Sequence, residues 1–144
     1  VGRLDEETTG LLLLTTDGHI VHDIASPDKH VEKTYAVKLD RELQHNDMET
    51  LSKGLTIDLE VNGDVTPFTT APAVVSIDDE GLVSLTISEG KKRQVRRMFA
   101  ALDYTVEGLH RTSIGGLNLN MFGVRSGEAV EIEETLLRQL VFDQ

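Results

Sequence analysis

One aspartate near the start of the sequence, Asp5, occupies a place where a reactive carboxylate could be held. It ends the segment Gly-Arg-Leu-Asp at residues 2–5 and precedes two glutamates and an apolar run at residues 10–16. A carboxylate on a rigid loop beside a buried strand can act as a nucleophile or a base. The same pattern is also typical of a turn or a helix cap, so spacing alone leaves both interpretations open.

A second candidate is the basic cluster at residues 91–97, which has five basic side chains and no acidic one. Gly90 permits a close backbone approach, and the start of the helix expected to follow offers unpaired N–H groups to an anion. Arg96 is flanked by apolar residues, and an arginine drawn inward needs a carboxylate partner because an unpaired buried charge is costly. The alternatives are a solvated helix face and an arginine that extends its charged end to water.

A third candidate is the pair Lys33 and Tyr35. Residues two apart on a strand face the same way. An aromatic ring beside a cation could stack on a nucleobase and hold a phosphate. A half-buried tyrosine beside a surface lysine is the alternative.

The elements that must position these residues comprise many β-segments and few helices. We predict strands over residues 10–16, 34–39, 104–109 and 129–132, hairpins over residues 55–70 and 73–88, and helices over residues 19–25, 48–53, 94–102 and 133–141. Asp17 can cap the first helix, and Asn46 or Asp47 the second, which Gly54 ends. This order predicts one α+β domain with a largely antiparallel sheet.

The composition narrows the function further. The 144 residues include no cysteine, which excludes a disulfide framework, a thiolate nucleophile and a cysteine-type zinc site. No apolar run approaches the length of about 18 residues that a membrane helix needs. The formal charge is −11, and outside residues 91–97 there are 9 basic and 25 acidic residues, a charge of −16. One positive patch on such a body can localise a polyanion.

Taken together, the segments resemble the motifs of the RNA pseudouridine synthases, in the bacterial subgroup that includes the ribosomal small-subunit enzyme and several large-subunit enzymes. The resemblance covers nearly the whole chain, in order, through residues 2–5 with 9–18, 32–35, 89–98, and 109–111 with 114–115. It implies a mixed, mainly antiparallel β-sheet with flanking helices and a central catalytic cleft. It also implies an isomerase that needs no cofactor and no metal. In the reaction the C1′–N1 bond of a uridine breaks, the base turns, and C1′ joins C5.

The resemblance also assigns roles to the candidate residues. Asp5 would attack the base C6 or the sugar C1′, a choice that stays open, and Tyr35 would stack on the uracil and help to remove the C5 proton. Arg96 would lie within salt-bridge reach of Asp5 and keep it ionised. The residues expected to hold RNA phosphates are Arg3, Lys33, Lys91, Lys92, Arg93 and Arg97.

Details of the motifs favour 16S over 23S ribosomal RNA, or a ribosomal assembly intermediate, as the partner. We expect a cytoplasmic monomer. Residues 1–144 would form the catalytic domain, and members of this subgroup carry an upstream segment and an S4-like RNA-binding domain that this sequence does not include. Two alternatives stay open: a non-catalytic RNA-binding or ribosome-assembly module, and an acid–base hydrolase that uses Asp5 and Glu89.

Overall fold

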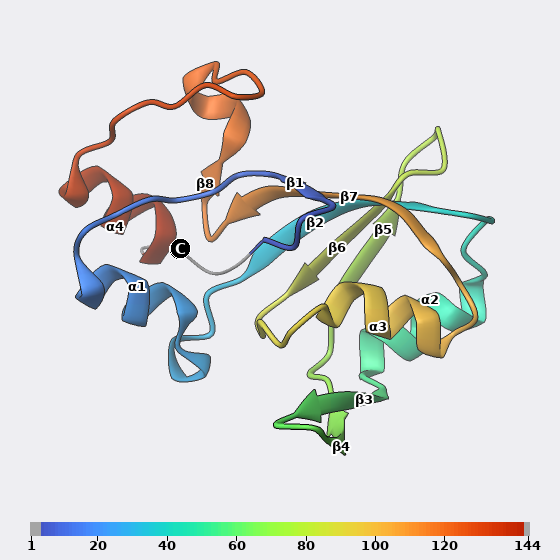
Figure 1. Cartoon of the computed structure of the whole chain (residues 1–144). Coiled ribbons are helices and arrows are strands. Elements are labelled where there is room, and N and C mark those ends of the chain that lie inside the picture. Colours follow the sequence, from blue (N-terminus) through green and yellow to red (C-terminus); the bar gives the residue numbers. More distant parts are fainter. Residues whose placement is uncertain (1–3, 143–144) are drawn as a thin grey trace.

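Six strands form one mixed sheet in the computed structural model, which describes residues 4–142 (Figure 1). These six strands are β1 (Thr8–Gly10), β2 (Lys33–Leu39), β5 (Val74–Ile77), β6 (Val83–Ile87), β7 (Val106–Ile114) and β8 (Leu117–Asn118). Two more strands, β3 (Thr56–Val61) and β4 (Asp64–Thr69), pair with each other in a separate sheet. The helices of the described part are α1 (Gly18–Ala25), α2 (His45–Lys53), α3 (Gln94–Ala101) and α4 (Glu134–Phe142), with 3₁₀ turns at Pro27–Lys29 and Leu119–Phe122.

Strand β7 is the organising strand of this sheet. The order is β1-β7-β2-β6-β5, with β8 also paired to β7. Only β1 runs parallel to its neighbour among the described strands, and the other pairs are antiparallel. The predicted α+β class and mainly antiparallel sheet are therefore confirmed.

The strand expected over residues 10–16 is placed differently, because β1 ends at Gly10. Gly10 has φ 109°, and a Cβ there would lie 2.2 Å from the carbonyl oxygen of Arg111 on β7. The next residue, Leu11, still donates its N–H to the same Arg111 carbonyl, at 2.8 Å. The chain leaves the sheet after this hydrogen bond. Leu11 and Leu13 then pack into the smaller of the two hydrophobic cores, in a segment that is not assigned as a strand.

Two hydrophobic cores flank the sheet. The larger one packs α2 and α3 against the central strands, with Leu51, Leu85, Met98 and Phe99 fully buried. The smaller one joins α1, α4 and the segment after β1. Figure 1 shows the two groups of helices at opposite ends of the sheet. The predicted helices are confirmed at all four places.

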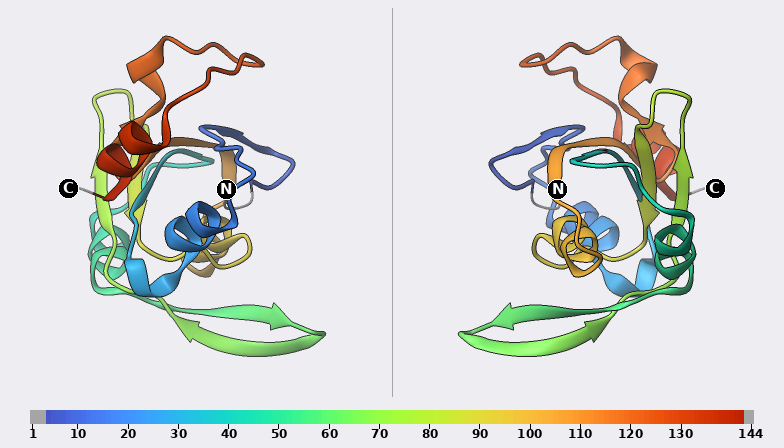
Figure 2. Two further views of the ribbon diagram at one scale, coloured as in Figure 1. Left: turned by 90° about the vertical axis from the view of Figure 1, so that its left-hand side faces the viewer. Right: turned by 90° about the vertical axis from the view of Figure 1, so that its right-hand side faces the viewer.

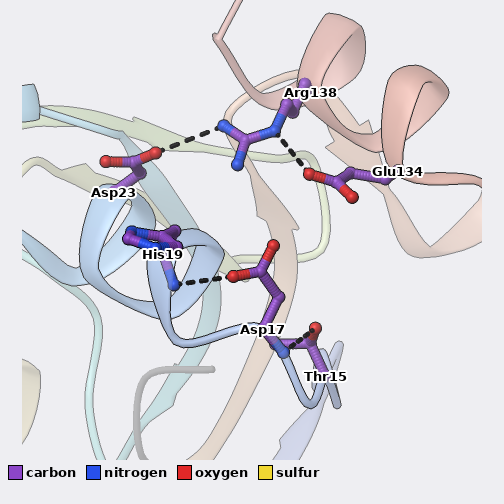
Figure 3. A network of polar contacts seen from close by, with 6 residues as sticks. All are labelled: Thr15, Asp17, His19, Asp23, Glu134 and Arg138. Atoms are coloured by element: carbon purple, nitrogen blue, oxygen red, sulfur yellow. Dashed lines mark hydrogen bonds and ion pairs between the residues drawn. The ribbon is translucent and has the colours of Figure 1, made fainter.

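Helices α1 and α4 are also joined at the surface by Arg138 (Figure 3). Its guanidinium lies 3.2 Å from Asp23 on α1 and 3.0 Å from Glu134 on its own helix. Asp17 caps α1, as predicted, by accepting the His19 N–H at 2.8 Å. Partly exposed ion pairs are worth about 0–1 kcal/mol, so the apolar contacts below them hold the helices.

The start of α2 differs from the prediction that Asn46 or Asp47 caps it. The helix begins at His45, and its N-cap Gln44 makes no side-chain cap bond. The carboxylate of Asp47 instead accepts the Tyr104 hydroxyl at 2.6 Å. Burial, followed by this contact with Asp47, raises the pKa of Tyr104.

Two strand predictions in the last third of the chain also need correction. The strand expected over residues 104–109 extends from Val106 to Ile114, because β7 pairs along both edges. Residues 129–132 form no strand, since no neighbouring strand pairs with them.

The predicted hairpins are confirmed. Strands β5 and β6 form one within the main sheet, and β3 and β4 form a separate two-stranded ribbon. Asn62 and Gly63 have φ 52° and 84°, the positive values that a tight hairpin turn requires. Figure 2 shows this ribbon reaching away from the body. Within residues 4–142, no helix is long and apolar enough to cross a membrane.

We expect Gly10→Ala to lower the free energy of unfolding by at least about 2 kcal/mol, because the backbone is left-handed and the new Cβ would meet β7. Gly18→Ala is the matched control, since no atom lies within 4 Å of a Cβ at that position. Urea unfolding of both variants measures the difference. Equal stability of the two variants would contradict the close approach.

Candidate active site

A pocket of about 430 Å³ opens where the loop before β1, strands β2 and β7, and the loop before α3 meet. Its volume lies within the range of about 300–1,000 Å³ that is usual for small-molecule sites. The residues predicted for the site that line it are Asp5, Lys33, Tyr35, Lys91, Lys92 and Arg93. These residues come from three separate parts of the sequence, which the sheet brings together.

Asp5 is held by the short turn that leads into β1. The Thr8 N–H bonds the Asp5 carbonyl oxygen at 2.9 Å, and Thr8 then pairs with Leu109 on β7. Because the turn is this short, β7 fixes the position of Asp5 relative to the other strands. The Asp5 side chain is 29% exposed and lines the pocket.

Asp5 forms an ion pair with Arg93, whose Nη1 lies 3.8 Å from Asp5 Oδ2. The same nitrogen lies 3.2 Å from Glu7 Oε2. A backbone hydrogen bond, followed by the bond from Arg93, lowers the pKa of Glu7. Arg93 also precedes α3 with φ 54°, so its side chain leaves the helix start beside the pocket.

The expectation that Arg96 pairs with Asp5 is wrong in this structure. Arg96 Nη1 donates to the Val106 carbonyl at 3.4 Å, and no ion pair joins Arg96 to Asp5 in the described chain. Its buried Nε has no hydrogen-bond partner among residues 4–142. Arg96 does not line the pocket, although its positive charge contributes to the lowered pKa of Glu7, which follows Asp5 by two residues.

Lys33 lies deeper than a surface phosphate ligand. Its side chain is 6% exposed, lines the pocket, and donates to the Ile24 carbonyl oxygen at 3.4 Å. Burial, followed by the nearby positive charge of Arg111, lowers the pKa of Lys33. Tyr35, two residues along β2, lines the same pocket, so the predicted shared face is confirmed.

Arg111 is a pocket residue that the sequence analysis did not select. It is 2% exposed, lies opposite Tyr35 on β7, and donates from Nε to the Leu11 carbonyl at 2.9 Å. The β2–β7 register shifts between Thr34 and Tyr35, which leaves Thr112 as an extra residue. Bulges commonly re-aim side chains beside active sites. The family motif at residues 109–111 was the feature of the sequence that could have identified Arg111 as a site residue.

The loop before α3 is held by Glu89 and Gln94. The Glu89 carboxylate accepts the Ala71 N–H at 3.0 Å and the Gln94 side-chain amide at 3.2 Å. Gln94 in turn accepts the Lys91 N–H at 3.1 Å. Glu89 does not line the pocket, which argues against a hydrolase that pairs it with Asp5.

One other predicted phosphate ligand, Arg97, lies outside the pocket. It donates to the Asp58 carbonyl on β3 at 2.8 Å. Arg3 lies outside the described residues.

The pocket is strongly cationic although the chain as a whole is acidic. Its charged lining residues are Asp5, Lys33, Lys91, Lys92, Arg93 and Arg111. Five positive groups facing one carboxylate favour an anionic ligand. The part of the chain that the structure describes holds no group of three His, Cys, Asp or Glu side chains arranged for a metal ion.

A known family combines this fold with these motifs. The family model described as RNA pseudouridylate synthase matches residues 1–101, and the chain belongs to this family. It is 47% identical over 119 residues to the ribosomal small subunit pseudouridine synthase A of Pasteurella multocida, covering 83% of this chain and 49% of that protein. It is 43% identical over 140 residues to the protein of the same description from Haemophilus influenzae, covering 97% and 57%.

A solved structure supports the same relationship. The structure described as "Crystal structure of pseudouridylate synthase" aligns with a TM-score of 0.83 and 43% identity, over 97% of this chain and 58% of that chain. The chain therefore spans about half the length of the curated relatives that it matches.

We expect Lys33→Met to raise the free energy of unfolding at neutral pH, because it replaces a charge that the fold buries. The lowered pKa of Lys33 means that the unfolded chain holds more protons than the folded chain between that pKa and the usual 10.5. Stability of the unsubstituted chain should therefore rise with pH in this window, and the variant should lack this contribution.

Urea unfolding near neutral pH and at about pH 10 measures both effects. Lys38→Met is the control, since Lys38 is exposed on the same strand. A Lys33→Met variant less stable than the unsubstituted chain at neutral pH would contradict the buried-charge account.

Proposed function

We propose that this chain is the catalytic domain of an enzyme that converts a specific uridine of ribosomal RNA to pseudouridine. The observation that carries the proposal is that Asp5 and Tyr35 line one cationic pocket in a chain of this family. A non-catalytic RNA-binding module would need the positive groups but no carboxylate among them.

The pocket suits a base removed from its stack. A uridine inside an RNA helix is inaccessible, so it must flip into the pocket at a cost of a few kcal/mol. Tyr35 would stack on the uracil ring while Lys91 and Lys92 hold the flanking phosphates. Arg93 would balance the charge of Asp5 before the attack, in the role first expected of Arg96.

In the reaction, the Asp5 carboxylate would attack C1′ of the sugar or C6 of the base. The C1′–N1 bond breaks, the uracil turns, and C5 forms a bond to C1′ as the carboxylate is released. C5 then loses its proton and N1 gains one, so the product is an isomer of the substrate. Tyr35 would help to remove the C5 proton.

We favour 16S ribosomal RNA, free or in an assembly intermediate, as the substrate. The relatives described above are named as small-subunit enzymes, which supports 16S over 23S RNA. The working form would be a cytoplasmic monomer. A further RNA-binding domain joined to this one, as the resemblance suggests, would raise the effective concentration of substrate at the pocket.

Asp5→Asn should lower isomerisation by more than about 1,000-fold while leaving the fold intact, because the amide is nearly isosteric but a poor nucleophile. Glu7→Gln is the matched control, since Glu7 shares the Arg93 contact but does not line the pocket. Each variant is incubated separately with 16S and 23S RNA, and pseudouridine is mapped. Normal turnover by folded Asp5→Asn would refute the assignment.

Lys91→Ala and Lys92→Ala should each reduce the slope of log affinity against log salt by about 0.7 on single-stranded RNA, because each removes one phosphate contact. Lys53→Ala, at the exposed end of α2, should leave the slope unchanged. Binding titrations at several salt concentrations provide the measurement. An equal slope for all three variants would show that the loop before α3 does not hold phosphate.

A further inference from the structure

Lys33 has no ion-pair partner among the described residues, although it is 6% exposed at the wall of the pocket. Its amine donates to the Ile24 carbonyl at 3.4 Å, beyond the usual length of an N–H···O bond. This carbonyl belongs to the last turn of α1, where the helix dipole gives a cation modest support. The Lys33 ammonium has three N–H donors. Among the described contacts it uses one of them, on Ile24, so two are available to a ligand.

We propose that Lys33 is a catalytic residue that contacts the flipped uracil and stabilises the negative charge that the base acquires during the reaction. This inference rests on the proposed function and deepens it. It replaces the role of phosphate ligand that the sequence suggested for Lys33.

The position of Lys33 relative to Tyr35 supports a contact with the base. The two residues are two positions apart on β2 and face the same pocket, which separates their Cα atoms by about 7 Å. A uracil stacked on the Tyr35 ring would therefore present its edge, which carries O2 and O4, toward the Lys33 amine. Lys91 and Lys92 are exposed, so they can meet phosphates outside the pocket while Lys33 cannot.

The electron balance of the reaction places negative charge on the base, which a nearby cation can stabilise. If Asp5 attacks C1′, the electron pair of the C1′–N1 bond moves to the uracil and spreads over N1 and O2. If Asp5 attacks C6, the pair of the C5–C6 double bond moves to C5 and O4. In both cases the base is an anion until C5 bonds to C1′ and the ring proton is redistributed. A preorganised cation at the base edge lowers this barrier without taking a proton.

The buried charge of Lys33 is expected to lower the stability of the folded chain. A charge held without a carboxylate partner destabilises the fold, and active sites often retain such groups for function. Lys33→Met should therefore be folded and yet slow. Removing one group of this kind typically lowers the rate by about 100–1,000-fold.

The test compares two substrates under single-turnover conditions with saturating protein. One RNA fragment carries uridine at the modified site, and the other carries 5-fluorouridine. Fluorine withdraws electrons and stabilises an anionic uracil, so the fluorinated base needs less help from Lys33. The assay follows the loss of the starting nucleoside after digestion, because fluorine at C5 blocks the final proton loss.

We expect Lys33→Met to lower the rate on uridine by about 100-fold or more. The fold-decrease in rate on 5-fluorouridine should be about ten times smaller. Affinity and salt slope should not change. Lys33→Arg, which retains the positive charge, should recover part of the rate, and Lys38→Met should match the unsubstituted chain on both substrates.

Equal slowing of both substrates by Lys33→Met would assign Lys33 a structural role at the end of α1 and overturn the inference. A weaker affinity with a reduced salt slope and a normal saturated rate would make it a phosphate ligand, and would also overturn it. If the unsubstituted chain isomerises no uridine in 16S or 23S RNA, the proposed function itself fails.

Discussion

The position of Asp5 depends on one close backbone approach, between Gly10 and strand β7. A side chain at Gly10 would collide with the Arg111 backbone, so the parallel pairing of β1 with β7 exists only because this residue has no Cβ. The pairing anchors the short turn that carries Asp5. The same strand pairs with β2 on its other edge, where Lys33 and Tyr35 lie. One strand therefore sets the distance between the carboxylate and the groups that would receive the base.

The distribution of charge distinguishes this pocket from the rest of the chain. The chain has a net charge of −11, yet five of its 14 basic side chains line the pocket around one carboxylate. Lys91 and Lys92 can attract phosphates from water, whereas Lys33 and Arg111 act from inside, where a low dielectric strengthens each interaction. A buried cation without an ion-pair partner among the described residues, as Lys33 is, reduces stability, so its retention at this place is consistent with a site that must stabilise an anion.

Local patterns in the sequence were sufficient for much of the fold. The Asn62–Gly63 turn, the Asp17 cap and the apolar spacing of residues 94–102 each predict an element that the structure contains. These signals work because turns, caps and amphipathic helices depend on residues close together in the chain. The alternation of Lys33 and Tyr35 likewise predicted their common face. The motifs at residues 2–5, 32–35 and 89–98 also predicted the family.

Contacts between distant segments were decided only by the tertiary structure. The sequence favoured Arg96 as the partner of Asp5, but the loop before α3 places Arg93, the N-cap residue, within ion-pair distance of Asp5 instead. Arg111 enters the pocket through an extra residue in β7, and no local pattern specifies the register of two strands some 70 residues apart. Burial of Lys33 depends in the same way on what packs around β2. Sequence determined which residues are present and how each segment folds, while packing decided which charges meet, because ionic contacts act through space.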